Sequence, residues 1–230
     1  MIRFLIWDVD GTLLDTYPAI NRAMLAALRA LQRSANCRTV DQLCKISFGH
    51  CVNTLASQLG LDAPKLLEQF HLELAAVPES QQAPFPGVLE LCHAAIEAGG
   101  ANFILTHRQR SDLSALLESN HLTQLFTDSV AGDDGFPRKP DPTGLLDLVR
   151  RNALDPAQAL VIGDRELDIV AAHRAGVRAC LYGTNPCAEP PDFVVTDFLD
   201  FLHTITLENA ATISAQTASG STTQPRRNYD

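Results

Sequence analysis

The sequence contains no hydrophobic run long enough to cross a membrane. Its first residues, MIRFLIWDVDG, hold an apolar stretch of only about half a dozen residues, which Arg3 interrupts, whereas a signal-peptide core needs roughly 7–15. A membrane-spanning helix needs about 20. We therefore expect a soluble, cytoplasmic protein with no membrane partner.

Blocks of like charge are also missing. The net charge is −9, and the acidic residues are spread along the chain. This balance argues against nucleic acid or an anionic membrane as a partner. It leaves local anion binding open, because a metal ion and a few well-placed cations can outweigh the overall charge.

Metal-binding patterns of cysteine and histidine are absent as well. The six cysteines form no CxxC pair, and the seven histidines show no ligand spacing. Nothing else points to an extracellular, disulfide-bonded chain. Cys37, Cys44 and Cys51 recur every seven residues, and we interpret them as small buried apolar side chains.

Helical and strand-like segments alternate along most of the chain, which predicts an α/β fold. A chain of 230 residues that is 46% hydrophobic can bury one core, or one core and a small second unit. Short apolar runs are typical of buried parallel strands. The predicted strands are Ile2–Trp7, Asn102–Leu105, Thr127–Ala131, Ala159–Ile162, Arg178–Tyr182 and Phe193–Val195.

One long segment lacks any strand pattern. Between residues 17 and 82 the apolar residues follow helical spacing in three places, so we expect a helical insertion there. The catalytic core would then comprise residues 1–16 and 83–203. The segment 204–230 is rich in Ser, Thr and Ala, and we expect it to be disordered.

Distinctive polar residues follow the predicted strands, where ligands bind in open α/β sheets. Asp8 and Asp10 point to the same side of an extended strand. Two carboxylates about 4 Å apart repel by about 4 kcal/mol at an effective dielectric of 20, so they require a cation. All-oxygen ligands suit Mg²⁺. The other polar residues at this edge are Thr106, Lys139, Asp164 and Asp168.

These residues lie in four ordered motifs: Asp8-Val9-Asp10-Gly11-Thr12-Leu13, Leu105-Thr106, Lys139-Pro140 and Gly163-Asp164-Arg165-Glu166-Leu167-Asp168. Together they resemble the motifs of the haloacid-dehalogenase-like superfamily. The helical insertion resembles the cap of its phosphoglycolate-phosphatase-like branch. The resemblance implies a doubly wound, mostly parallel sheet with an inserted helical cap. It also implies a Mg²⁺-dependent phosphatase acting on a small phosphorylated metabolite, such as a phosphoglycolate-like compound or a phosphosugar.

The resemblance also implies a role for each motif. Asp8 would attack phosphorus and form an aspartyl-phosphate. Asp10, kept protonated by acidic surroundings, would protonate the leaving group and then activate water. Thr106 and Lys139 would bind the phosphate. The metal ligands would be Asp8, the main-chain carbonyl of Asp10, and Asp164, with Asp168 in support.

Weaker candidates lie near these motifs. His107 and Arg108 could reach the leaving group, but solvated loop positions are an equally good interpretation. His50, beside Gly49 in a predicted break between two helices, could help to choose the substrate, although a surface position fits a histidine better. Arg165 could neutralise nearby acids or simply form a salt bridge at the start of a helix.

Other functions remain open on this reasoning. A dehalogenase needs no second acid at the position of Asp10, so that residue favours phosphoryl chemistry. A phosphosugar mutase would need both aspartates and is the nearest alternative. A receiver-like phospho-binding protein would have a different motif order. The sequence leaves monomer and homodimer equally open.

Overall fold

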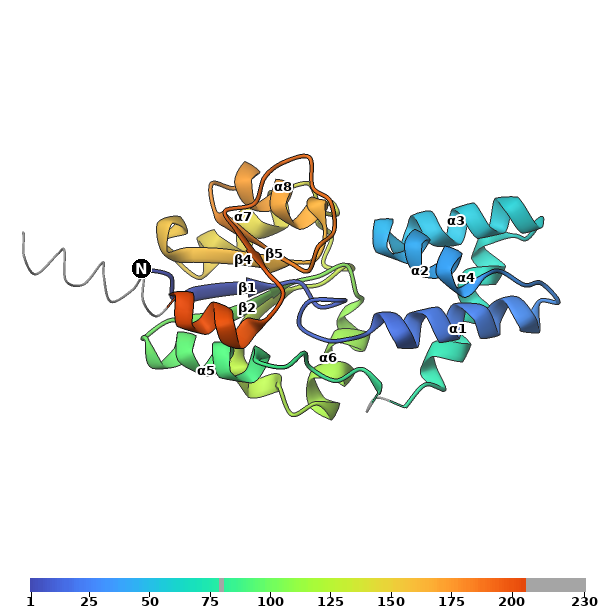
Figure 1. Cartoon of the computed structure of the whole chain (residues 1–230), viewed down its shortest axis with the longest axis horizontal. Coiled ribbons are helices and arrows are strands. Elements are labelled where there is room, and N and C mark those ends of the chain that lie inside the picture. The colour runs from blue at the N-terminus through green and yellow to red at the C-terminus, as the bar shows by residue number, and fades with distance from the viewer. Residues whose placement is uncertain (79–80, 206–230) are drawn as a thin grey trace, which may run out of the picture.

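The computed structural model describes residues 1–78 and 81–205. A sheet with helices on both faces forms one unit, and helices α1–α4 lie together beside it (Figure 1). Within the described residues, no helix is long and apolar enough to cross a membrane. Nearly all of the predicted disordered tail, from residue 206 onward, lies outside the described residues.

The sheet has six strands, all parallel, in the order β3-β2-β1-β4-β5-β6. This confirms the predicted α/β class and its doubly wound sheet, and each predicted strand is found within two residues of its predicted ends. The bounds are β1 Phe4–Trp7, β2 Ala101–Leu105, β3 Phe126–Val130, β4 Ala159–Gly163, β5 Arg178–Tyr182 and β6 Phe193–Val195.

Side chains that alternate along β1 build a separate core on each face of the sheet. Leu5 and Trp7 pack into one apolar cluster and Ile6 into the other. The first cluster is covered by α5 (Val88–Glu97), α6 (Arg110–Ser119) and the helical residues 198–205; the second is covered by α7 (Thr143–Arg151) and α8 (Glu166–Arg174).

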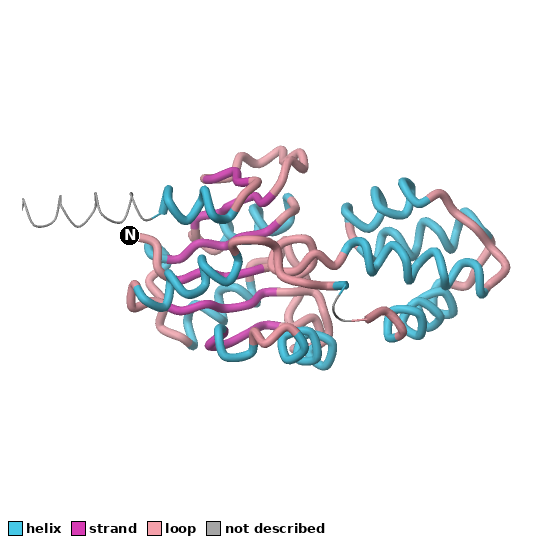
Figure 2. Tube along the Cα trace, turned by 60° about the horizontal axis from the view of Figure 1, so that its bottom comes forward, coloured by secondary structure: helices cyan, strands magenta, loops and turns pink. Residues whose placement is uncertain are grey.

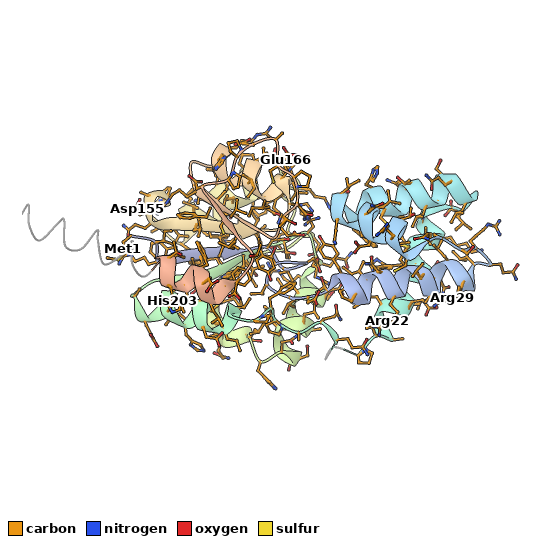
Figure 3. All side chains as sticks on the ribbon, viewed as in Figure 1. Met1, Arg22, Arg29, Asp155, Glu166 and His203 are labelled. Atoms are coloured by element: carbon orange, nitrogen blue, oxygen red, sulfur yellow. The ribbon has the colours of Figure 1, made fainter. Side chains whose placement is uncertain are left out.

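The strand order reverses beside β1, between β2 and β4, and such a reversal opens a crevice beyond the carboxyl ends of the strands. In Figure 2 the N-terminus lies at the end of the sheet away from the helical unit, and because all six strands are parallel, their carboxyl ends face that unit. In Figure 3, Met1 and Asp155 lie at the opposite end of the sheet, whereas Glu166, shortly after β4, lies toward α1–α4. The crevice therefore faces the inserted helices.

The inserted helices bury their own apolar cluster. Their bounds are α1 Tyr17–Ala30, α2 Cys37–Ile46, α3 Phe48–Leu59 and α4 Ala63–Ala75. Three of them begin at side chains that accept a main-chain N–H, as helix N-caps usually do: these caps are Asn36, Ser47 and Asp62.

Helix α2 was missed by the sequence analysis, which predicted three helices here. Val40, Leu43 and Cys44 follow helical spacing, but the segment is polar overall and only Val40 and Cys44 are buried. The break between helices lies at Ser47, not beside Gly49 as predicted. Cys37 is exposed, so the expectation that it is buried is wrong; Cys44 and Cys51 are buried.

The chain enters and leaves the helical unit through two segments that run side by side. Leu14 and Pro84 form an isolated antiparallel bridge. The N–H of Asp15 donates to the carbonyl of Ala83 at 2.9 Å, and the N–H of Phe85 donates to the carbonyl of Leu13 at 3.2 Å. The limits of a separate cap domain at residues 17 and 82 remain a prediction.

Candidate active site

Three buried carboxylates meet at the crevice. Asp8 follows β1, Asp164 follows β4, and Asp168 lies in the first turn of α8. Each offers an oxygen within 4.8 Å of the others. All three side chains are almost completely shielded from solvent. Like charges this close are strongly unfavourable without cations, so the cluster requires positive charge.

Lys139 supplies the first cation. Its Nζ donates to Asp8 Oδ1 at 2.7 Å, to Asp168 Oδ1 at 2.6 Å and to the carbonyl of Leu105 at 2.9 Å. Burial alone would lower the pKa of Lys139, but the charges of Asp168 and Asp8 raise it above its usual value. The lysine therefore stays charged and fixes the orientation of the Asp8 carboxylate.

Arg165 is the second cation and lies between two of the carboxylates. Its guanidinium is 3.3 Å from Asp8 Oδ2, and its Nε is 3.3 Å from Asp164 Oδ1. Burial alone would raise the pKa of Asp8, but Lys139 and Arg165 together lower it. At Asp164 the balance is reversed. Burial and the charges of Asp8 and Asp168 raise the pKa of this carboxyl to about 7, because together they outweigh the lowering effect of Arg165. Three carboxylates thus face two cations.

The carboxylate cluster fits a divalent cation bound through oxygen. Asp164 Oδ2 accepts a hydrogen bond from the hydroxyl of Tyr17 at 2.8 Å. Within the described residues its Oδ1 is buried and makes no hydrogen bond, and its only charged contact is the 3.3 Å ion pair with Arg165 Nε. A buried acceptor that lacks a hydrogen bond is costly and remains available to a further cation. Hard oxygen donors suit Mg²⁺, so the residues present are compatible with the expected metal.

Two glycines allow this close approach. Gly11 has φ +77°, and a Cβ there would lie 2.2 Å from the Tyr17 ring and 2.9 Å from Asp164 Oδ2. A Cβ on Gly163 would lie 2.3 Å from the side chain of Asp168. Both positions therefore exclude a side chain.

Asp10 is surrounded differently from the prediction. Its Oδ1 accepts hydrogen bonds from the Thr16 hydroxyl at 2.6 Å and from Arg108 Nε at 2.8 Å, and Arg108 Nη2 lies 2.7 Å away. The expectation of acidic surroundings for Asp10 is therefore wrong, since its charged contact is the guanidinium of Arg108. The sequence could not show that Arg108 folds back onto the first motif.

Thr106 and His107 follow β2 as expected. The buried Thr106 hydroxyl accepts the N–H of Arg108 at 3.2 Å. Nε2 of His107 accepts the N–H of Lys139 at 2.9 Å. Burial and the Lys139 charge lower the pKa of His107 to about 3, so the ring is neutral. In this structure His107 supports the loop that carries Lys139.

A cavity of about 500 Å³ lies between this cluster and the helical unit, and Asp10, His107, Arg108 and Arg165 are among its lining residues. The structure does not bring His50 into that lining. His50 is exposed in the first turn of α3, which agrees with its interpretation as a surface residue.

Sequence reasoning missed two contacts to Asp164. Tyr17 reaches it from the start of α1, and Asn185 Nδ2 donates to its carbonyl oxygen at 2.7 Å. Tyr17 is the first residue of α1 and Asn185 lies in the loop after β5, so both are outside the four motifs. No spacing in the sequence marks them, because each is placed by the fold.

Comparison with known proteins agrees with this geometry. A family model described as haloacid dehalogenase-like hydrolase matches residues 5–182. A protein named phosphoglycolate phosphatase from Photobacterium profundum is 31% identical, over 90% of this chain and 96% of its own length. One of the same name from Mesorhizobium japonicum is 32% identical, over 75% and 79% of the two chains.

Solved structures share the fold. A predicted phosphoglycolate phosphatase from Haemophilus somnus superposes with a TM-score of 0.78 at 23% identity, covering 89% of this chain and 98% of that one. A proposed β-phosphoglucomutase from Thermotoga maritima gives 0.74 at 19% identity, covering 89% and 99%. With the family model spanning well over half of its residues, the chain belongs to the haloacid dehalogenase-like hydrolase family.

Proposed function

We propose that the chain is a Mg²⁺-dependent phosphatase that hydrolyses a small phosphomonoester through an aspartyl-phosphate on Asp8. The observation that carries the proposal is the buried Asp8 carboxylate, which Lys139 holds in place beside two further carboxylates. The relatives named phosphoglycolate phosphatase support phosphoester hydrolysis. By resemblance to these relatives, a phosphoglycolate-like compound or a phosphosugar is the first substrate class to assay.

The residues divide the chemistry between them. An oxygen of Asp8 forms a bond to phosphorus while the bond to the leaving oxygen breaks. Asp10 gives a proton to that oxygen and then takes one from the water that hydrolyses the intermediate. For this, Asp10 has to carry a proton at the start of the step, and Arg108 has to exchange its contact with Asp10 for one with the substrate.

Thr106 and Lys139 stabilise the transferred phosphoryl group. Asp8, Asp164 and the main-chain carbonyl of Asp10 are the proposed Mg²⁺ ligands, with Asp168 in support through Lys139. When bound, the metal would supply positive charge to the phosphoryl oxygens. Preorganised charge of this kind is commonly the largest contribution to such catalysis.

The test is hydrolysis of p-nitrophenyl phosphate by Asp8→Asn, with Asp155→Asn as the control at an exposed position. We expect the first variant to fold and to lose turnover, while the control retains it. Chelation by EDTA should abolish activity and Mg²⁺ should restore it. Retained activity in Asp8→Asn contradicts the nucleophile, and isomerisation of a sugar 1-phosphate without phosphate release would identify a mutase instead.

A further inference from the structure

The cavity above the carboxylate cluster is larger than a two-carbon phosphoester requires. Its volume is about 500 Å³. Sites for drug-sized ligands span roughly 300–1,000 Å³. Asp10, His107, Arg108 and Arg165 line it from the core, and residues of the inserted helices line the rest. The phosphate end and the leaving-group end are therefore built by different units.

The leaving-group end is mostly apolar, with Asn53 and His71 as polar members of its lining. Ile20, Phe48, Val52, Leu67, Phe70 and Leu74 from α1, α3 and α4 line it. The rings of Phe48 and Phe70 lie 4.5 Å apart between centroids, at 45° to each other. A wall of aliphatic and aromatic side chains gains free energy by covering apolar surface of a ligand.

This wall offers no lysine or arginine to a second anionic group; its polar side chains are Tyr17, Asn53 and His71. Helices α1–α4 are fully described, and they contribute neither Lys nor Arg to the lining. The lining arginines all come from the core, where Arg108 pairs with Asp10 and Arg165 with Asp8. Arg138 lies next to Lys139, at the phosphate end. A carboxylate placed against the six apolar side chains would lose its hydration without gaining a lysine or arginine partner there.

We propose that the preferred substrate is a phosphomonoester whose leaving group is an uncharged, largely apolar body, longer than glycolate and held by α1, α3 and α4. This inference rests on the proposed phosphatase function and specifies its substrate. An apolar leaving group fills the space between Ile20 and Leu74, and its phosphate remains at Asp8. Phosphoglycolate would leave most of the wall uncovered.

The test uses n-alkyl phosphates, because ethyl, butyl and hexyl esters have leaving alcohols of similar acidity and differ mainly in length. We expect kcat/KM to rise from ethyl to hexyl by at least about tenfold, since a single added methylene in an apolar pocket can already be worth roughly tenfold. Phosphoglycolate should be hydrolysed less efficiently than hexyl phosphate. A flat series, or a preference for phosphoglycolate, overturns the inference.

Variants on α4 test whether the dependence of kcat/KM on alkyl chain length arises at this wall of the cavity. Leu74→Lys places a cation in the cavity wall, and we expect it to reduce the hexyl-to-ethyl ratio toward one. Leu72→Lys is the matched control, because Leu72 is 63% exposed on the same helix and does not line the cavity. An unchanged ratio in a folded Leu74→Lys protein counts against the proposal, as does an equal fall in the control.

Binding separates this inference from the proposed function. Non-hydrolysable n-alkylphosphonates are titrated calorimetrically in the presence of Mg²⁺. If affinity rises with chain length while none of the esters is hydrolysed, the apolar site is supported and the phosphatase proposal fails. If the esters are hydrolysed but neither kcat/KM nor phosphonate affinity depends on length, the phosphatase proposal stands and the apolar site is refuted.

Discussion

Replacing Arg165 by Met should lower the free energy of unfolding of the metal-free protein and raise its affinity for Mg²⁺. At 3.3 Å from Asp8 and from Asp164, each contact of the guanidinium corresponds to about 5 kcal/mol of attraction at an effective dielectric of 20. Desolvation offsets much of this, and removing one partner of a buried ion pair costs about 3–5 kcal/mol. We therefore expect the free energy of unfolding without metal to fall by about 3 kcal/mol.

The affinity for Mg²⁺ should change in the opposite direction and increase. The guanidinium occupies the space beside the two carboxylate oxygens that are the proposed metal ligands, so binding in the unaltered protein has to displace it. A charge-assisted hydrogen bond contributes about 1.5–3 kcal/mol, and 1.4 kcal/mol is a factor of ten, so Arg165→Met should bind Mg²⁺ about 10–100-fold more tightly.

Isothermal titration with Mg²⁺ measures this affinity, and thermal unfolding at stepped Mg²⁺ concentrations checks it through the added stability of the bound form. Arg174→Gln is the control, since Arg174 is exposed at the end of the same helix. Equal or weaker Mg²⁺ binding by Arg165→Met would refute the reasoning, because it would mean that Arg165 remains in place and assists the metal.

Three further predictions concern stability. His107 is neutral when folded, because burial and Lys139 lower its pKa to about 3, whereas the unfolded chain protonates it below about 6.5. Stability should fall as pH drops below 6.5, by up to about 1.4 kcal/mol per pH unit, and urea unfolding at stepped pH should show this slope reduced in His107→Asn. Gly11→Ala should lower the free energy of unfolding by about 1–3 kcal/mol more than Gly60→Ala, which also has positive φ but no atom within 4 Å of its Cβ. Lys139→Met should cost about 3–5 kcal/mol without metal in the same assay, because it leaves Asp8 and Asp168 without their shared cation; a loss below 1 kcal/mol would contradict that role.

The sheet was predictable because buried parallel strands consist of short continuous apolar runs. Arg178–Tyr182 and Phe193–Val195 were predicted with their observed bounds. Helix α2 was missed although Val40, Leu43 and Cys44 follow helical spacing, because the segment is polar overall and buries only two small apolar side chains.

The site was predictable in part, for a similar reason. Carboxyl ends of parallel strands share one edge, so the convergence of Asp8, Asp164 and Lys139 follows from order along the chain. The pairing of Arg108 with Asp10 and the reach of Tyr17 to Asp164 depend on how loops and helices pack in three dimensions. No local pattern encodes such contacts.

The paired segments that join the two units act geometrically as a ribbon. Two chains bonded to each other, as Asp15 is to Ala83, resist independent twisting and favour bending about one axis. Tyr17 lies beside that axis, whereas the 14 residues of α1 carry its other end about 21 Å farther away. Bending of the ribbon would therefore displace the far end of the helical unit most and Tyr17 least. Substrates could be exchanged at the apolar end while the Tyr17 contact to Asp164 stays intact.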